Sequence, residues 1–155
     1  MKIQIDSLKE GHNGWLETVS PGELELNGSP FNGKVSVQLD VDKRSGKIPV
    51  SIKAKSVGRF TCDRCGEEFD REIEGKCNIM FVMREQPLPD EMPGDDVRSY
   101  FSGQSELDVT SDIRDALLLS IPFKLLCSED CKGLCPGCGV NLNFEECKCL
   151  KEKDR

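Results

Sequence analysis

The fold is decided by residues 34–55, which read KVSVQLDVDKRSGKIPVSIKAK. Apolar and polar residues alternate in two runs, and Arg44-Ser45-Gly46 between the runs favours a tight turn. Because successive side chains of a strand point to opposite faces, this period of two predicts a β-hairpin. Its apolar face comprises Val35, Val37, Leu39, Val41, Val50, Ile52 and Ala54.

The alternation resumes beyond a second reversal, FTCDRCG at residues 60–66, and continues to Met83. We therefore expect the Cys62-x-x-Cys65 pair at a hairpin tip. Residues 1–33 are repeatedly broken by glycine and proline, which excludes a long helix there. Only short strands are expected in that part, such as Lys2–Asp6 and Glu23–Leu26.

Residues 84–106 are rich in acidic residues, proline and glycine, a composition that predicts a mobile acidic loop. One clear helix is expected at residues 110–120, with Asp108 or Thr110 as its cap and its apolar face in the core. The expected fold class is α+β: an antiparallel sheet or partly open β-barrel, one packed helix and a cysteine-rich, zinc-knuckle tail. We expect one domain with two parts, a β-rich part at residues 1–126 and a metal-binding tail packed on it at 127–155.

The tail contains six of the nine cysteines of the chain. Within it, the turn Cys135-Pro136-Gly137-Cys138-Gly139 is typical of a zinc knuckle, and a closed structural zinc site needs four ligands. The favoured interpretation is two four-thiolate sites. One would comprise Cys135, Cys138, Cys147 and Cys149, and the other Cys62, Cys65, Cys127 and Cys131.

Other interpretations of the cysteines stay open. A single site of Cys62, Cys65, Cys135 and Cys138 is the main alternative, so one or two Zn²⁺ ions are expected. An iron–sulfur cluster would show similar ligand spacing. The Cys62-x-x-Cys65 pair also matches a thiol–disulfide oxidoreductase, although flanking strands and Asp63 are atypical of one. Cys77 is expected in the core, and His12 in a turn without a chemical role.

The formal net charge of −7 excludes binding to nucleic acid by bulk charge. Residues 43–64 are the exception, with seven bases and one acid. There, Lys47, Lys53, Lys55 and Arg59 share one parity and form either a candidate RNA contact or simply a solvated face. No signal peptide and no apolar run of membrane-spanning length is visible, so we expect a cytoplasmic protein without a membrane partner. No phosphate loop, dinucleotide-binding motif or catalytic carboxylate pair is visible either, so no small-molecule substrate is expected.

Three motifs resemble the YceD family of large ribosomal RNA subunit accumulation proteins: FTCDRCGEEF at residues 60–69, LDV at 107–109 leading to LSIP at 119–122, and CKGLCPGCGVNLN at 131–143. The resemblance implies a bacterial-type, non-enzymatic factor for accumulation or processing of large-subunit (23S) ribosomal RNA and for ribosome assembly. The implied partners are pre-rRNA or a large-subunit ribosomal protein. The cysteines carry over only as metal ligands. A zinc-ribbon adaptor for other protein complexes is a further alternative.

Overall fold

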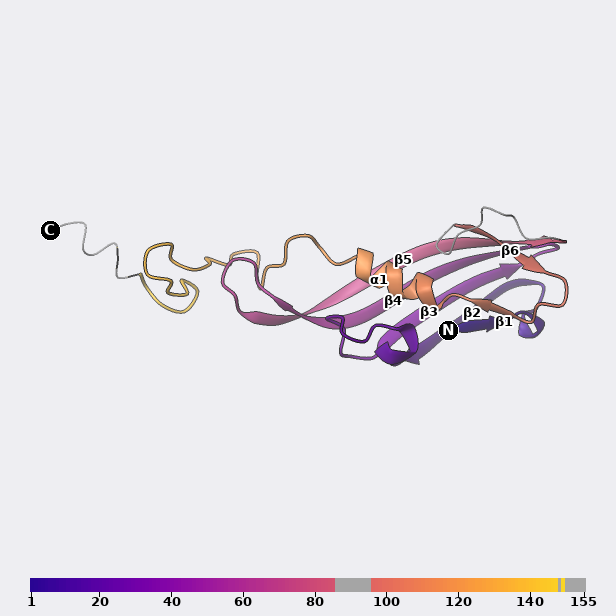
Figure 1. The fold of residues 1–155 in the computed structure, drawn as a ribbon, viewed down its shortest axis with the longest axis horizontal. Helices are drawn as coiled ribbons and strands as arrows, with labels where there is room; N and C mark the ends of the chain where they lie inside the picture. Colours follow the sequence, from indigo (N-terminus) through magenta and orange to yellow (C-terminus); the bar gives the residue numbers. More distant parts are fainter. Residues whose placement is uncertain (86–95, 148, 150–155) are drawn as a thin grey trace. The chain divides into compact units, whose positions relative to one another are not determined.

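The structure, a computed structural model, describes residues 1–85, 96–147 and 149 (Figure 1). The chain forms two compact units. The sheet unit comprises Met1–Gly58 and Glu72–Ile121, and the cysteine unit comprises Arg59–Arg71 and Pro122–Arg155. This division differs from the predicted boundary between residues 126 and 127, because the second hairpin tip groups with the tail. That the tail packs on the β-rich part stays a prediction.

Most of the regular secondary structure of the described residues is β-strand, in an open, mixed five-stranded sheet and a separate two-stranded ribbon. The large sheet has the order β2-β3-β4-β5-β6, with β2/β3 and β3/β4 antiparallel and β5/β6 parallel. Its strands are β2 (Gly11–Val19), β3 (Val35–Lys43), β4 (Lys47–Thr61), β5 (Glu68–Arg84) and β6 (Val97–Phe101). The ribbon pairs β1 (Lys2–Gln4) antiparallel with β7 (Glu106–Asp108).

The predicted first hairpin is confirmed in β3 and β4. Val41 pairs with Val50 and Val37 with Ala54, so that the apolar residues of both strands share one buried face. The turn is closed by backbone hydrogen bonds between Arg44 and Lys47, and Gly46 adopts a φ of 73°, which glycine tolerates without strain. The alternating pattern therefore determines both the strand pairing and the buried face.

The single α-helix of the described residues, α1 (Thr110–Leu119), matches the predicted helix to within one residue. Asp108 accepts hydrogen bonds from the backbone N–H and the hydroxyl of Thr110, at 2.9 and 2.6 Å. The helix lies across one face of the sheet (Figure 1) and touches β5, where a Cβ added to Gly75 would lie 2.7 Å from the amide nitrogen of Leu117. Its buried residues are Ile113, Ala116 and Leu117, which confirms its core position.

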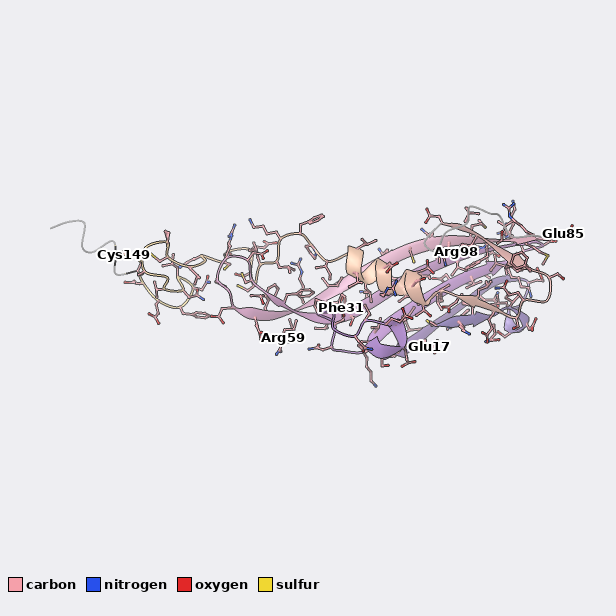
Figure 2. All side chains as sticks on the ribbon, in the orientation of Figure 1. Glu17, Phe31, Arg59, Glu85, Arg98 and Cys149 are labelled. Carbon is pink, nitrogen blue, oxygen red and sulfur yellow. The ribbon has the colours of Figure 1, made fainter. Side chains whose placement is uncertain are left out.

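Two further contacts join the helix to the sheet. Arg98 of β6 (labelled in Figure 2) forms a hydrogen-bonded ion pair with Asp112, with Nη1 3.0 Å from Oδ2. Cys77 of β5 is half-buried and its Sγ lies 3.7 Å from the carbonyl oxygen of Asp112. Burial raises the pKa of Cys77 to about 11, and the carboxylate of Asp112 adds to this rise, so the thiol stays protonated. No helix in the described part of the chain has the length and apolarity to cross a membrane.

The first third of the chain corrects two predictions. The expected strand Glu23–Leu26 is wrong, because Pro21–Leu24 forms a 3₁₀ helix with a capping box between Ser20 and Glu23. His12 lies not in a turn but in β2, which pairs along nine residues with β3. Gly11 and Gly14 therefore lie inside a strand at the edge of the sheet, where a partner strand supplies the hydrogen bonds.

The segment predicted as an acidic loop, residues 84–106, is also structured in part. Val97–Phe101 forms β6, and its Tyr100 is buried. Because β6 runs parallel to β5, the sheet is mixed rather than purely antiparallel. The acidic residues at 86–95 lie outside the described residues.

Candidate metal centres

The first cysteine group, here called the hairpin site, contains Cys62, Cys65, Cys127 and Cys131. All four Sγ atoms lie within 4.8 Å of one another. The Cys62–Cys131 and Cys65–Cys127 sulfur distances are 3.7 and 3.6 Å. Tetrahedral zinc, with Zn–S bonds of about 2.3 Å, needs sulfurs roughly 3.8 Å apart, so the group has the dimensions of a zinc site.

Local hydrogen bonds form the hairpin site. At the tip between β4 and β5, the backbone N–H of Cys62 donates to Glu67 and that of Gly66 donates to Cys62, at 2.8 and 2.9 Å. Asp63 then aligns the tail with the tip: its N–H donates to the carbonyl of Leu125, and its carboxylate accepts the N–H of Leu125. Asp63, which is atypical of a thiol redox pair, thus has a structural role beside the thiols.

The second group, here called the knuckle site, contains Cys135, Cys138, Cys147 and Cys149 (Figure 2 labels Cys149). Its four Sγ atoms also lie within 4.8 Å of one another, with Cys135–Cys147 at 3.1 Å and Cys138–Cys147 at 3.8 Å. The turn from Cys135 to Gly139 is closed by a backbone hydrogen bond, in which the N–H of Gly139 donates to the carbonyl of Cys135 at 2.8 Å.

Gly137 lies close to a ligand sulfur inside this turn. A Cβ at this position would lie 3.1 Å from the Sγ of Cys149, which is tighter than an ordinary contact. A side chain there would push against the fourth sulfur of the knuckle site. The Pro-Gly pair thus leaves room for the sulfur of the last ligand.

Hydrogen-bond donors favour the thiolate form at some of these sulfurs. The backbone N–H of Cys138, followed by the contact with Cys147, lowers the pKa of Cys135 to about 6. At Cys62, burial raises the pKa, but backbone N–H groups, chiefly that of Cys127, outweigh it and lower the pKa to about 6. The side-chain amide of Asn143 lowers the pKa of Cys131.

Other sulfurs of the same groups resist ionisation. Burial and the neighbouring Cys131 raise the pKa of Cys127 to about 12, and the contacts with Cys138 and Cys147 raise that of Cys149 to about 12. Thiolates packed this closely repel one another, so each group ionises only in part by itself. A bound dication would remove this repulsion, and the donor set fits Zn²⁺, for which four thiolates are one of the usual structural ligand sets.

The structure brings together the same two sets of four thiols that the spacing predicted. The pairs Cys62/Cys65 and Cys135/Cys138 fall in different groups, so the single-site alternative is not formed. That either group binds metal stays a prediction. Sequence reasoning missed two neighbours of Cys131: Asn143 donates to its sulfur at 3.4 Å, and Arg64 donates to its carbonyl at 2.9 Å.

The predicted basic face is largely paired with acidic residues. In the sheet unit, Lys55 lies 2.9 Å from Glu74 and 3.5 Å from Glu72, and Lys53 lies 3.3 Å from Glu74. In the cysteine unit, Arg59 (Figure 2) forms a two-bond ion pair with Asp70, at 2.9 and 3.2 Å. Lys47 is exposed. These ion pairs reduce the positive charge that is available to contact RNA phosphates. The RNA contact stays a prediction.

Comparison with known proteins gives the family. Residues 50–155, which include all eight clustered cysteines, match the family described as "Large ribosomal RNA subunit accumulation protein YceD". The chain is 29% identical to "Large ribosomal RNA subunit accumulation protein YCED homolog 1, chloroplastic" of Zea mays, over 83% of this chain and 53% of that protein. Its namesake in Arabidopsis thaliana is 28% identical, over 81% of this chain and 47% of that protein.

An uncharacterized protein of Mycobacterium tuberculosis is 28% identical, over 79% of this chain and 58% of that protein. The chain thus spans about half the length of the curated relatives it matches. No solved structure matches it. The family match covers most of the chain and confirms the resemblance seen in its motifs, so this chain belongs to the YceD family.

Proposed function

We propose that this chain is a non-enzymatic factor for the accumulation of large-subunit ribosomal RNA, acting in rRNA processing and ribosome assembly. The observation that carries the proposal is the family match over residues 50–155. Two plant relatives whose names state this role support it. The proposed partners are pre-rRNA or a large-subunit ribosomal protein, and the proposed location is the cytoplasm.

The proposal gives the cysteines a structural role. Each group would hold one Zn²⁺ ion, with the hairpin site joining the β4–β5 tip to the tail and the knuckle site folding the tail itself. Support comes from the close approach of four sulfurs in each group. The sulfurs of Cys62 and Cys65 each lie within 3.7 Å of a tail thiol, an arrangement that suits metal ligation better than a two-cysteine redox pair.

The proposal is tested by depleting the protein in its host and measuring large-subunit rRNA against small-subunit rRNA. Depletion should lower this ratio, and expression of the wild-type chain should restore it. Two further variants separate the parts of the proposal. The first variant, Cys135→Ser/Cys138→Ser, tests whether the metal is needed. The second, Lys53→Glu/Lys55→Glu, tests whether the basic residues contact RNA.

Cys77→Ser is the matched control, since this thiol lies outside both groups, and it should restore the ratio as the wild type does. An unchanged ratio after depletion would overturn the proposed role. Full rescue by the Lys53→Glu/Lys55→Glu variant would remove only the RNA contact. Full rescue by the Cys135→Ser/Cys138→Ser variant would show that the knuckle site does not serve this role.

A further inference from the structure

A short segment of the cysteine unit belongs to both candidate sites. Cys131 at one end of the segment is a ligand of the hairpin site, and Cys135 at the other end is a ligand of the knuckle site. Three contacts pair the segment with the loop between Cys138 and Cys147. These are the bridge Leu134–Asn141 and the hydrogen bonds from Leu142 N to Gly133 O at 2.9 Å and from Cys135 N to Val140 O at 2.8 Å.

Asn143, in that same loop, reaches across to the hairpin site. Its side-chain nitrogen donates to the sulfur of Cys131 at 3.4 Å, and its side-chain oxygen accepts the N–H of Lys132 at 2.8 Å. Asn141 fixes the orientation of Asn143, because its side-chain oxygen accepts the backbone and side-chain N–H groups of Asn143, at 3.1 and 2.8 Å. A loop closed by the knuckle site therefore carries the donor for a hairpin-site ligand.

The β4–β5 tip also contacts the shared segment. The backbone N–H of Leu134 donates to the carbonyl of Arg64 at 3.2 Å, and the Arg64 guanidinium donates to the carbonyl of Cys131. Gly133 lies so close to the tip that an added Cβ would be 3.1 Å from the Arg64 carbonyl oxygen. Ordering of the segment by either site therefore positions groups that the other site needs.

We infer that the two sites bind metal cooperatively, with Asn143 as the residue that positions the Cys131 ligand according to the state of the knuckle site. The inference rests on the proposed metal binding. A knuckle site that holds its ion closes the loop and fixes the amide against Cys131. By linkage, an ion in the hairpin site strengthens the knuckle site by the same factor. Loss of such an outer contact typically costs about 10–100-fold in metal affinity.

Native mass spectrometry of the full-length, reduced protein at one equivalent of Zn²⁺ per chain tests this. The wild-type protein should appear mainly as metal-free and two-zinc forms, because cooperative binding suppresses the one-zinc form. Asn143→Ala should raise the one-zinc form and make one ion about 10–100-fold easier to remove with a competing chelator. All eight thiols remain in this variant, so a loss of ligands cannot explain the result.

Two further variants make the test more specific. Asn143→Asp keeps the size of the side chain but replaces the donor with a carboxylate, and should raise the one-zinc form as well. Phe144→Ala truncates an exposed neighbour in the same loop and should behave as the wild type does. A dominant one-zinc form in the wild type would overturn the coupling, and equal distributions in wild type and Asn143→Ala would overturn the role of Asn143 in it. A wild-type protein that binds no zinc would overturn the proposed metal function itself.

Discussion

At the scale of single residues, Gly75 controls how closely α1 approaches the sheet. A Cβ at this position would lie 2.7 Å from the amide nitrogen of Leu117 and closer still to the carbonyl of Ala116. These are backbone atoms, so the helix itself would have to shift. We predict that Gly75→Ala lowers the free energy of unfolding of the sheet unit by about 1–3 kcal/mol, as overpacking does elsewhere. Urea unfolding followed by circular dichroism measures the change.

Gly33→Ala is the matched control for this prediction. A Cβ there would be 3.6 Å from the carbonyl oxygen of Val57, an ordinary contact, and Gly33 is not among the glycines with positive φ. Its free energy of unfolding should stay within about 0.5 kcal/mol of the wild-type value. If the two variants had equal free energies of unfolding, α1 would be able to move away from the added Cβ at Gly75 without loss of stability.

At the scale of elements, β4 and β5 are linked by charge pairs as well as by the hydrogen bonds of the sheet. The side chains of Lys55, Lys76 and Lys53 all lie within 3.3 Å of the Glu74 carboxylate. The hydrogen bond from Lys55, followed by that from Lys76, lowers the pKa of Glu74 from 4.5 to about 2. The folded chain therefore releases this proton more readily than the unfolded chain does.

The sign of the pH effect follows from this lowered pKa. Glu74 stabilises the fold above pH 4.5, and this contribution is lost as the pH falls toward 2. We predict that Lys55→Gln raises the pKa of Glu74 toward 4.5, while Lys47→Gln, on the same strand, leaves it unchanged. Carbon-13 NMR titration of the Glu74 carboxyl measures both, and an unchanged midpoint in Lys55→Gln would contradict the proposed cause.

The elements also differ in how far the sequence predicts them. The β3–β4 hairpin was predictable because its alternation is local and its turn contains glycine. Strand β2 was not, since Gly11 and Gly14 suggest a loop and its pairing with β3 supplies the order. Strand β6 depends on parallel pairing with β5, a contact distant in sequence that no local pattern reveals.

The candidate site shows the same limit. Cysteine spacing favoured the two groups that the structure forms, because ligand pairs at a turn are a local feature, but it left a single-site alternative open. The contact of Asn143 with Cys131 was not predictable, since the side chain of an asparagine in a loop most often hydrogen-bonds to the backbone of its own turn. The ion pairs of Lys53 and Lys55 were missed for a related reason: the acids lie on the next strand.

At the scale of the whole molecule, the two units are stabilised by different means. The sheet unit buries a large apolar core of valine, leucine and isoleucine. Among the described residues of the cysteine unit, one buried cluster consists of Cys62, Cys65 and Cys131, with Phe69 and Leu126 packed against it. Together with the buried Phe60, the proposed ligands thus make up much of the buried interior of this unit. Binding of structural zinc in comparable peptides supplies about 10–16 kcal/mol, so order in this unit should depend on metal.

We therefore predict that chelation under reducing conditions unfolds one unit and spares the other. Hydrogen exchange followed by mass spectrometry should speed up in peptides from residues 59–71 and 122–147, while β3 and α1 keep their protection. Returning Zn²⁺ should restore the slow exchange, which separates metal loss from oxidation of the thiols. If metal-free, reduced protein kept slow exchange in both units, the sulfur clusters would be packed cysteines rather than metal ligands. Loss of protection in β3 as well would show instead that the sheet unit depends on the metal-held tail.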